Sequence, residues 1–154
     1  MKALLTAGLF TALTLQALPA VAEQSADEKA VRLVALDYIE SQITVNPQQI
    51  KPALHPKLKK RTYWTDKNGK PFLVETSYAT MVSVAGTYNR DGKQFPPDPR
   101  IEIEIFDIDQ RAASVKLTAD EWIDYMHLMK DDNGEWKILN VLWQYHDTER
   151  HKTK

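Results

Sequence analysis

Cysteine is absent from all 154 residues of the sequence. This absence excludes disulfide bonds, lipid attachment at a cysteine, and any metal site that depends on thiolate ligands. An excess of one charge is also lacking, because 20 basic residues and 21 acidic residues leave a net charge of −1. Such a balance does not indicate binding to nucleic acid or to an anionic membrane surface. Without disulfide bonds, the folded part must be stabilised by its own hydrophobic core.

A hydrophobic run long enough to span a membrane is missing as well. The uncharged, mostly apolar run at residues 3–15 is shorter than the roughly 20 residues that a membrane-spanning helix needs. Lys2 precedes this run, Pro19 follows it, and Ala20-Val21-Ala22 places small residues where a signal peptidase cleaves. We predict that residues 1–22 are a cleavable signal peptide, that the protein is periplasmic or secreted, and that no stable membrane insertion follows cleavage.

The remaining chain suits one domain at residues 23–149, followed by a basic tail at residues 150–154 that we expect to be solvated. Its first half favours helices. A helix over residues 27–44 is predicted from the capping-box spacing of Ser25 and Glu28 and from a stripe of apolar residues. A short helix should begin at Pro47, and a third should begin after Ser77 and end at Gly86.

The second half favours strands. A hairpin is predicted around Asn68-Gly69, a loop at residues 89–99, and a half-exposed strand starting at Ile101. After a turn at residues 109–111, we expect one long extended run over residues 113–130 and another over residues 135–145. Asn133-Gly134 suits a two-residue turn between these last two strands, with both residues at positive φ.

That turn fixes a register for the last hairpin. It places His127 opposite Asn140, Tyr125 opposite Leu142 and Met129 opposite Ile138, whereas a three-residue loop would slip the pairing by one. We interpret the face with His127 as the inner one. The other face carries Asp124, Leu139, Val141 and Trp143, among other residues. Because both faces hold large apolar side chains, we expect a second copy of the chain to cover the outer one, which predicts a homodimer.

Several stretches of the sequence resemble the putative lumazine-binding family, within the nuclear transport factor 2-like (NTF2-like) superfamily that also holds ketosteroid isomerase-like proteins. The matching stretches are Val31 to Glu40, Leu54-His55-Pro56, Ala113 to Lys116, Trp122 to Leu128 and Gly134 to Trp143. The resemblance implies an α+β, cone-shaped fold in which N-terminal helices pack on a strongly bent antiparallel sheet. It also implies a pocket at the open end of the cone and dimers formed through the outer sheet face. It leaves the activity open, because related cones are isomerases, dehydratases, cyclases, binding modules and adaptors.

Five polar residues are candidates for binding a small, flat, partly apolar ligand. They are His127, Asn140, Tyr125, Gln144 and, from the first helix, Tyr38. Fixed polar groups among apolar walls are typical of such pockets. The alternative is that His127 and Asn140 bond each other as an ordinary cross-strand pair, and that Tyr38 is a core residue.

Catalytic residues are not identified by any motif. An isomerase or dehydratase could use His127, Tyr38 or Asp120 for proton transfer, whereas Asp124 falls on the outer face by the predicted register. The tryptophans could stack a flat ring, but they are also typical of cores and interfaces; we expect Trp136 in the core and Trp143 at the interface.

Cofactor and metal sites are not predicted either. The four histidines are scattered without ligand spacing, and no glycine-rich phosphate loop occurs. The sequence therefore favours an exported small-molecule-binding protein of unknown ligand. The alternatives are an enzyme that uses the same pocket and a non-catalytic dimeric adaptor with a filled cone.

Overall fold

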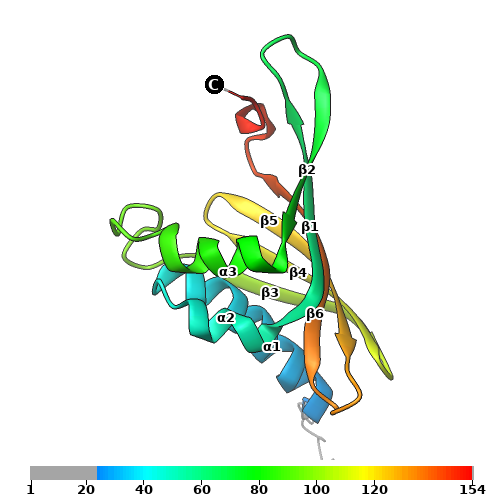
Figure 1. Ribbon diagram of the computed structural model, residues 1–154. Helices are drawn as coiled ribbons and strands as arrows, with labels where there is room; N and C mark the ends of the chain where they lie inside the picture. The colour runs from blue at the N-terminus through cyan, green and yellow to red at the C-terminus, as the bar shows by residue number, and fades with distance from the viewer. Residues whose placement is uncertain (1–23, 154) are drawn as a thin grey trace, which may run out of the picture.

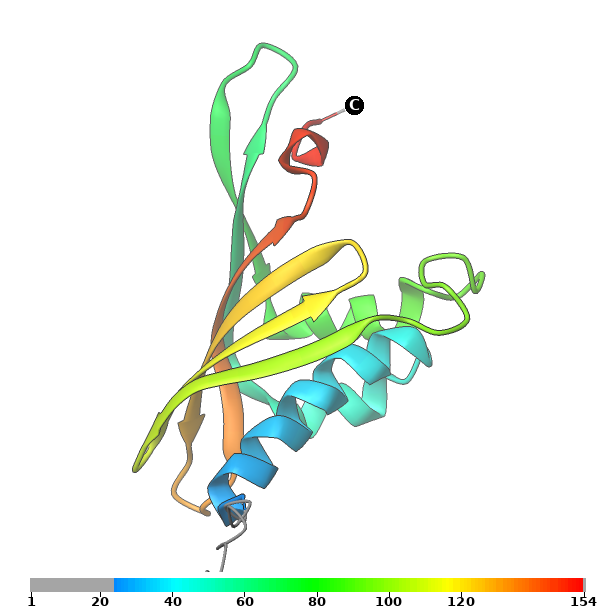
Figure 2. The same cartoon turned by 180° about the vertical axis from the view of Figure 1, so that it is seen from behind.

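The computed structural model describes residues 24–153, and the predicted signal peptide lies outside them. Three helices cover one face of a six-stranded, strongly bent sheet (Figures 1 and 2), which confirms the α+β cone. The helices are α1 (Ala26–Ile43), α2 (Pro47–Ala53) and α3 (Tyr78–Thr87). The strands are β1 (Leu54–Thr65), β2 (Pro71–Ser77), β3 (Ile101–Asp109), β4 (Ala112–Ala119), β5 (Trp122–Lys130) and β6 (Trp136–Tyr145).

The strand order in the sheet is β2-β1-β6-β5-β4-β3. Neighbouring strands are antiparallel except β1 and β6, which are parallel. The β1–β2 hairpin extends beyond the helical layer, and the C-terminal segment lies beside it (Figure 1). Within residues 24–153, no helix combines the length and apolar character that crossing a bilayer requires.

The helices begin where their capping residues predict. The Ser25 side chain accepts a hydrogen bond from the Glu28 amide, and the Ser77 hydroxyl accepts one from the Thr80 amide. Helix α3 does not end at Gly86 but continues to Thr87. A Cβ at Gly86 would lie 3.4 Å from Cγ of Pro47, an ordinary van der Waals contact, so the approach of α3 to α2 does not require glycine there.

The single extended run predicted at residues 113–130 is wrong. The chain reverses at Asp120-Glu121, and β4 and β5 form an antiparallel pair. No glycine, proline or asparagine marks this reversal. Tertiary contacts hold it instead: Asp120 Oδ1 accepts a hydrogen bond from the Arg100 amide (3.0 Å), and the Glu121 carbonyl accepts one from the His146 amide (2.9 Å).

The β5–β6 turn also differs from the prediction. Gly134 has a φ of 81°, whereas Asn133 is not among the residues with positive φ, and the Asp131 amide donates to the Glu135 carbonyl. The loop is therefore a three-residue one, and it slips the register so that Met129 pairs with Lys137. A bulge at Leu139 then restores the predicted register, so that His127 does face Asn140 and Tyr125 does face Leu142.

The burial pattern of β5 shows which face of the hairpin meets the helices. On β5 the buried residues are Trp122, Asp124, Met126 and Leu128, while Tyr125 and Met129 are exposed. The interpretation of the His127 face as the inner one is therefore wrong. The two-sided apolar pattern indicated which residues share a face, but it held no signal for which face the helices cover.

The basic tail is not solvated throughout, contrary to expectation. His151 is 8% exposed, and its carbonyl accepts a hydrogen bond from the Thr65 amide (2.8 Å). The Thr153 amide donates to the Thr65 carbonyl (2.9 Å), and Lys152 forms a parallel bridge with Thr65. Together with a 3-10 turn, η1 (Thr148–Arg150), these contacts fasten the C-terminal segment to the end of β1.

Candidate functional site

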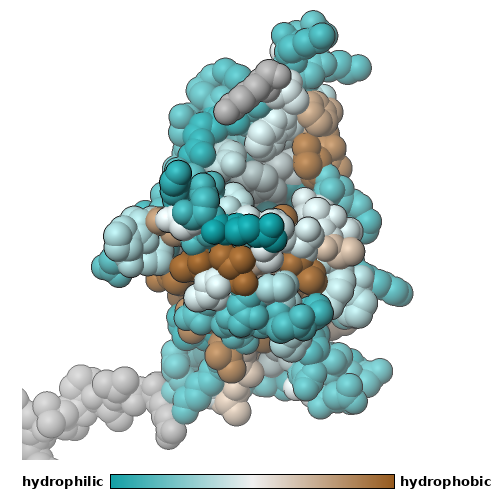
Figure 3. All heavy atoms as spheres, turned by 60° about the vertical axis from the view of Figure 1, so that its left-hand side comes forward, coloured by the Kyte–Doolittle hydropathy of each residue, from teal (hydrophilic) through white to brown (hydrophobic). Residues whose placement is uncertain are grey.

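A cavity of about 190 Å³ lies between the sheet and α3. Its walls come from both helices and strands, and they combine aromatic, aliphatic and a few polar side chains. The lining residues are Gln42, Lys60, Thr76, Met81, Val84, Tyr88, Trp122, Trp143 and Tyr145. Figure 3 turns the helical side forward and shows apolar residues in a band across the middle of this face, with hydrophilic residues above and below.

Lys60 on β1 supplies the positive charge of the cavity wall. Its Nζ donates hydrogen bonds to Oδ1 of Asp124 (2.8 Å) and to Oη of Tyr38 (2.7 Å). The Asp124 side chain is fully buried, and the Lys60 side chain is only 10% exposed. Nε1 of Trp122 donates to Oδ2 of Asp124 (3.0 Å), so both carboxylate oxygens are engaged. Lys60 therefore lines the cavity as one member of a buried ion pair, and Asp124 lies behind it with a hydrogen bond to each carboxylate oxygen.

Tyr38 on α1 is the second hydrogen-bond partner of Lys60 and lies behind it without lining the cavity. Burial raises the pKa of the Tyr38 hydroxyl well above its usual range, and the negative charge of Asp124 raises it further. The hydroxyl is therefore neutral at physiological pH. The Lys60 ammonium also lies 5.4 Å from the centre of the Tyr38 ring and 5.0 Å from that of Trp143, which are cation–π distances.

Aromatic rings form much of the remaining wall. Tyr88 and Trp122 pack edge-to-face at 6.0 Å between ring centres, and Trp143 packs edge-to-face on Tyr145 at 5.1 Å. The guanidinium of Arg150 lies 4.1 Å from the centre of the Tyr145 ring and forms an ion pair with Glu121. Burial also raises the pKa of Tyr88. These rings offer flat apolar surfaces for a ligand.

The chemistry available in this cavity is that of one ammonium among aromatic rings. An ammonium has three hydrogen-bond donors, and two of those of Lys60 are used by Asp124 and Tyr38. Within residues 24–153, the third ammonium hydrogen of Lys60 has no hydrogen-bond acceptor. The same part of the chain holds no group of three acidic or histidine side chains placed to bind a metal ion.

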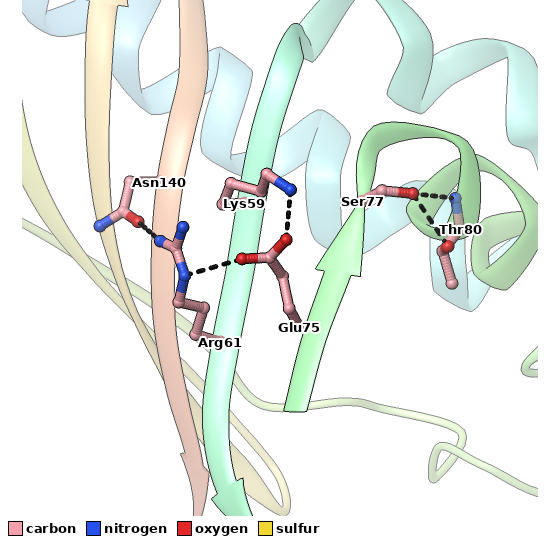
Figure 4. A network of polar contacts seen from close by, with 6 residues as sticks. All are labelled: Lys59, Arg61, Glu75, Ser77, Thr80 and Asn140. Atoms are coloured by element: carbon pink, nitrogen blue, oxygen red, sulfur yellow. Dashed lines mark hydrogen bonds and ion pairs between the residues drawn. The ribbon is translucent and has the colours of Figure 1, made fainter. Parts of the chain in front are cut away.

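Four of the five predicted ligand-binding residues lie on the outer sheet face instead. Nδ1 of His127 lies 3.2 Å from Nδ2 of Asn140, so these residues form the cross-strand pair that was the alternative interpretation. Arg61 donates to Oδ1 of Asn140 (2.9 Å) and to Oε2 of Glu75 (3.0 Å), as Figure 4 shows. Tyr125 and Gln144 are exposed, and neither lines the cavity.

Of the other predicted residues, Tyr38 does not line the cavity either, but its hydroxyl accepts a hydrogen bond from the lining residue Lys60. Neither His127 nor Asp120 lines the cavity. Trp136 is buried, as expected, and donates from Nε1 to Asp27 (3.0 Å). Trp143 was expected at an interface but lines the cavity, because the hairpin face that it shares with Asp124 is the one that meets the helices.

Sequence reasoning missed Lys60, and it considered Asp124 but set it aside as an outer-face residue. Lys60 stands in a run of basic residues, Lys57 to Arg61, which is typical of a solvated surface. The alternation of inward and outward side chains along a strand could have identified Lys60, because Leu58, Lys60 and Thr62 share the buried face of β1. Asp124 shares the buried face of β5 with Trp122 and Met126, and the inverted face assignment concealed it.

Comparisons with known proteins agree with this architecture. Residues 26–144 match the sequence family described as "Putative lumazine-binding". No curated protein matches the chain. Among solved structures, an NTF2-like protein of unknown function from Shewanella baltica has 20% identity and a TM-score of 0.58, over 80% of this chain and 98% of that one.

Two further structures extend the likeness. An NTF2-like protein of unknown function from Silicibacter pomeroyi has 13% identity and a TM-score of 0.62, over 80% of this chain and 100% of that one. A ketosteroid isomerase-like protein from Erwinia carotovora atroseptica has 10% identity and a TM-score of 0.53, over 80% and 99%. At these identities the likeness shows the fold alone.

Proposed function

Because this chain belongs to the putative lumazine-binding family, within the NTF2-like superfamily, we propose that it binds a small, partly apolar molecule in the cavity beside Lys60. The observation that carries the proposal is a concave site whose wall combines four aromatic residues with the lysine side chain of Lys60. Apolar walls with a few convergent polar groups are the usual composition of a ligand site.

The size of the cavity limits the ligand. An engineered cavity of about 150 Å³ accommodates benzene. A cavity of about 190 Å³ therefore holds one ring or a compact pair of fused rings. The rings of Trp122 and Trp143 would contact the faces or edges of such a ligand, because aromatic pairs prefer offset-stacked or edge-to-face geometry.

Binding is favoured over catalysis by the state of the candidate proton-transfer groups. Both oxygens of Asp124 accept hydrogen bonds, and the pKa of Tyr38 is raised well above its usual range. His127 and Asp120, the other candidates, do not line the cavity. An isomerase or dehydratase needs a group in the pocket that exchanges a proton near neutral pH.

Export and dimerisation are further parts of the proposal. The leader pattern at residues 1–22 supports cleavage and delivery to the periplasm or beyond. A homodimer through the outer sheet face would cover exposed apolar residues such as Tyr63, Tyr125 and Leu142, the last of which is 52% exposed. Val141 and Trp143, which the sequence suggested for this interface, face inward and take no part in it.

The test is native mass spectrometry of the mature protein purified from the cells that make it. We expect a dimer that carries an additional small mass. Val84→Phe should lose this mass because the new ring fills the cavity, whereas Ser83→Phe, an exposed neighbour on the same helix, should keep it. Retention of the mass by Val84→Phe would place the ligand elsewhere. A protein without an adduct that also ignores added flat ring compounds would contradict the proposed function.

A further inference from the structure

The charges around the cavity are unusually simple. Lys60 is the one lining residue with a charged side chain, and the fully buried Asp124 lies 2.8 Å behind its ammonium. The remaining lining residues are aromatic, aliphatic, amide or hydroxyl side chains. The Lys60–Asp124 pair at this cavity therefore carries no net charge.

We propose that Asp124 sets the charge selectivity of this cavity, so that it takes uncharged flat ring compounds that bear a carbonyl oxygen and rejects their carboxylate analogues. This inference rests on the proposed function, because it concerns the ligand of the same site. It makes Asp124 a specificity-determining residue that acts through Lys60 and does not line the cavity itself.

The preference for a carbonyl follows from the third donor of Lys60. Tyr38 Oη and Asp124 Oδ1, at 2.7 and 2.8 Å, take two of the three ammonium hydrogens. The rings of Trp143 and Tyr38, with centres 5.0 and 5.4 Å away, also face the ammonium but offer it no oxygen acceptor for this third hydrogen. A carbonyl oxygen in the cavity would accept the third hydrogen in a charge-assisted bond, which a hydrocarbon of the same shape cannot do.

The rejection of carboxylates follows from the buried partner. A bound carboxylate would bring a second negative charge to a site that holds one ammonium and one carboxylate already. A buried charge without compensation is costly, and Asp124 cannot turn away from Lys60 freely because Trp122 holds its other oxygen at 3.0 Å. A neutral carbonyl compound gains the hydrogen bond without this cost.

Three probes of one shape separate these effects: 1-indanone with a carbonyl, indane with no acceptor, and indane-1-carboxylate with a negative charge at pH 7. Binding is followed by calorimetry and by the indole NH signals of Trp122 and Trp143 in a nitrogen–proton NMR spectrum. We expect 1-indanone to bind about 10-fold more tightly than indane, the worth of one hydrogen bond to a charged group. The carboxylate should bind at least about 10-fold more weakly than 1-indanone.

Two variants test the role of Asp124 itself. Asp124→Asn removes the compensating charge, and we expect it to reverse the order so that the carboxylate binds more tightly than 1-indanone. If this variant does not fold, Lys60→Met/Asp124→Leu removes both charges together. That double variant should bind indane and 1-indanone equally while still excluding the carboxylate.

The outcomes distinguish this inference from the function on which it rests. If none of the three probes binds the wild type, the proposed small-molecule site fails. If the wild type binds the carboxylate as tightly as 1-indanone, or if Asp124→Asn keeps the wild-type order, the site stands but its charge selectivity is overturned. The inference is supported if the wild type shows the expected order and Asp124→Asn reverses it. Where that variant does not fold, the supporting result is the loss of the preference for 1-indanone over indane in the double variant.

Discussion

Removing Lys60 without its partner is the sharpest test of the buried Lys60–Asp124 pair. Lys60→Met leaves the fully buried Asp124 carboxylate with Nε1 of Trp122 as its remaining hydrogen-bond donor. Breaking a buried pair in this way costs about 3–5 kcal/mol, because an uncompensated charge remains inside the protein. That is a large part of a total stability of about 5–15 kcal/mol for a domain. The Tyr38 hydroxyl also loses the ammonium that donates to it.

The double variant Lys60→Met/Asp124→Leu should recover most of this loss. Replacing both members of a buried pair with apolar residues of similar size is often close to neutral. A matched control is Lys59→Met, the neighbouring lysine, whose side chain is 46% exposed and pairs with Glu75. An exposed ion pair is worth at most about 1 kcal/mol, so this control should change stability little.

The assay is urea unfolding followed by tryptophan fluorescence, with the free energy of unfolding extrapolated to zero denaturant. The double-mutant cycle consists of the wild type, Lys60→Met, Asp124→Leu and the double variant. It gives the coupling free energy between Lys60 and Asp124 directly. A loss below about 1 kcal/mol for Lys60→Met, or a double variant as unstable as the sum of the single ones, would refute the reasoning. Either result would mean that the ammonium and the carboxylate are not a desolvated pair.

Other consequences of the structure are equally measurable. Burial lowers the pKa of His151, whose Nε2 accepts a hydrogen bond from the Tyr145 amide (2.8 Å). The free energy of unfolding should therefore fall as the pH drops below about 6.5, because the unfolded state then binds more protons. His151→Phe should flatten this dependence in urea titrations at pH 7.5 and 5.5. Gly134→Ala should cost about 1 kcal/mol by the same assay, because its φ is 81°, whereas Gly86→Ala within α3 should be neutral or stabilising by up to about 1 kcal/mol. Leu142→Lys should convert the proposed dimer to monomer in sedimentation at micromolar concentration, and a monomeric wild type would contradict the interface.

Much of the fold could be predicted because its signals are local. Ser25, Asn46 and Ser77 cap helices through contacts with residues two or three positions ahead, so short sequence windows contain the whole interaction. The reversal at Asp120-Glu121 could not be predicted in this way. It depends on the amides of Arg100 and His146, which approach it only in the folded sheet.

The candidate site was less predictable, because its key contacts join distant parts of the chain. Tyr38, Lys60 and Asp124 come from α1, β1 and β5, and no spacing within one element reveals such a cluster. The pairing of His127 with Asn140 was predicted, yet their place relative to the helices was inverted. The bulge at Leu139 adds a second difference, because it changes the facing only of the residues between it and the turn.

The three-residue turn and the bulge at Leu139 have a consequence for alignments with homologous sequences. A regular hairpin with a two-residue turn and no bulge would span His127 to Asn140 with the same number of residues, because the one-residue slip at the turn is undone at the bulge. Such a homologue would align here without a gap. Trp136 and Ile138, which are buried in this protein, would then be matched with positions that face solvent in the homologue. Substitution patterns at these columns would mix core and surface positions, so columns 135–138 should be compared only among sequences known to share the bulge.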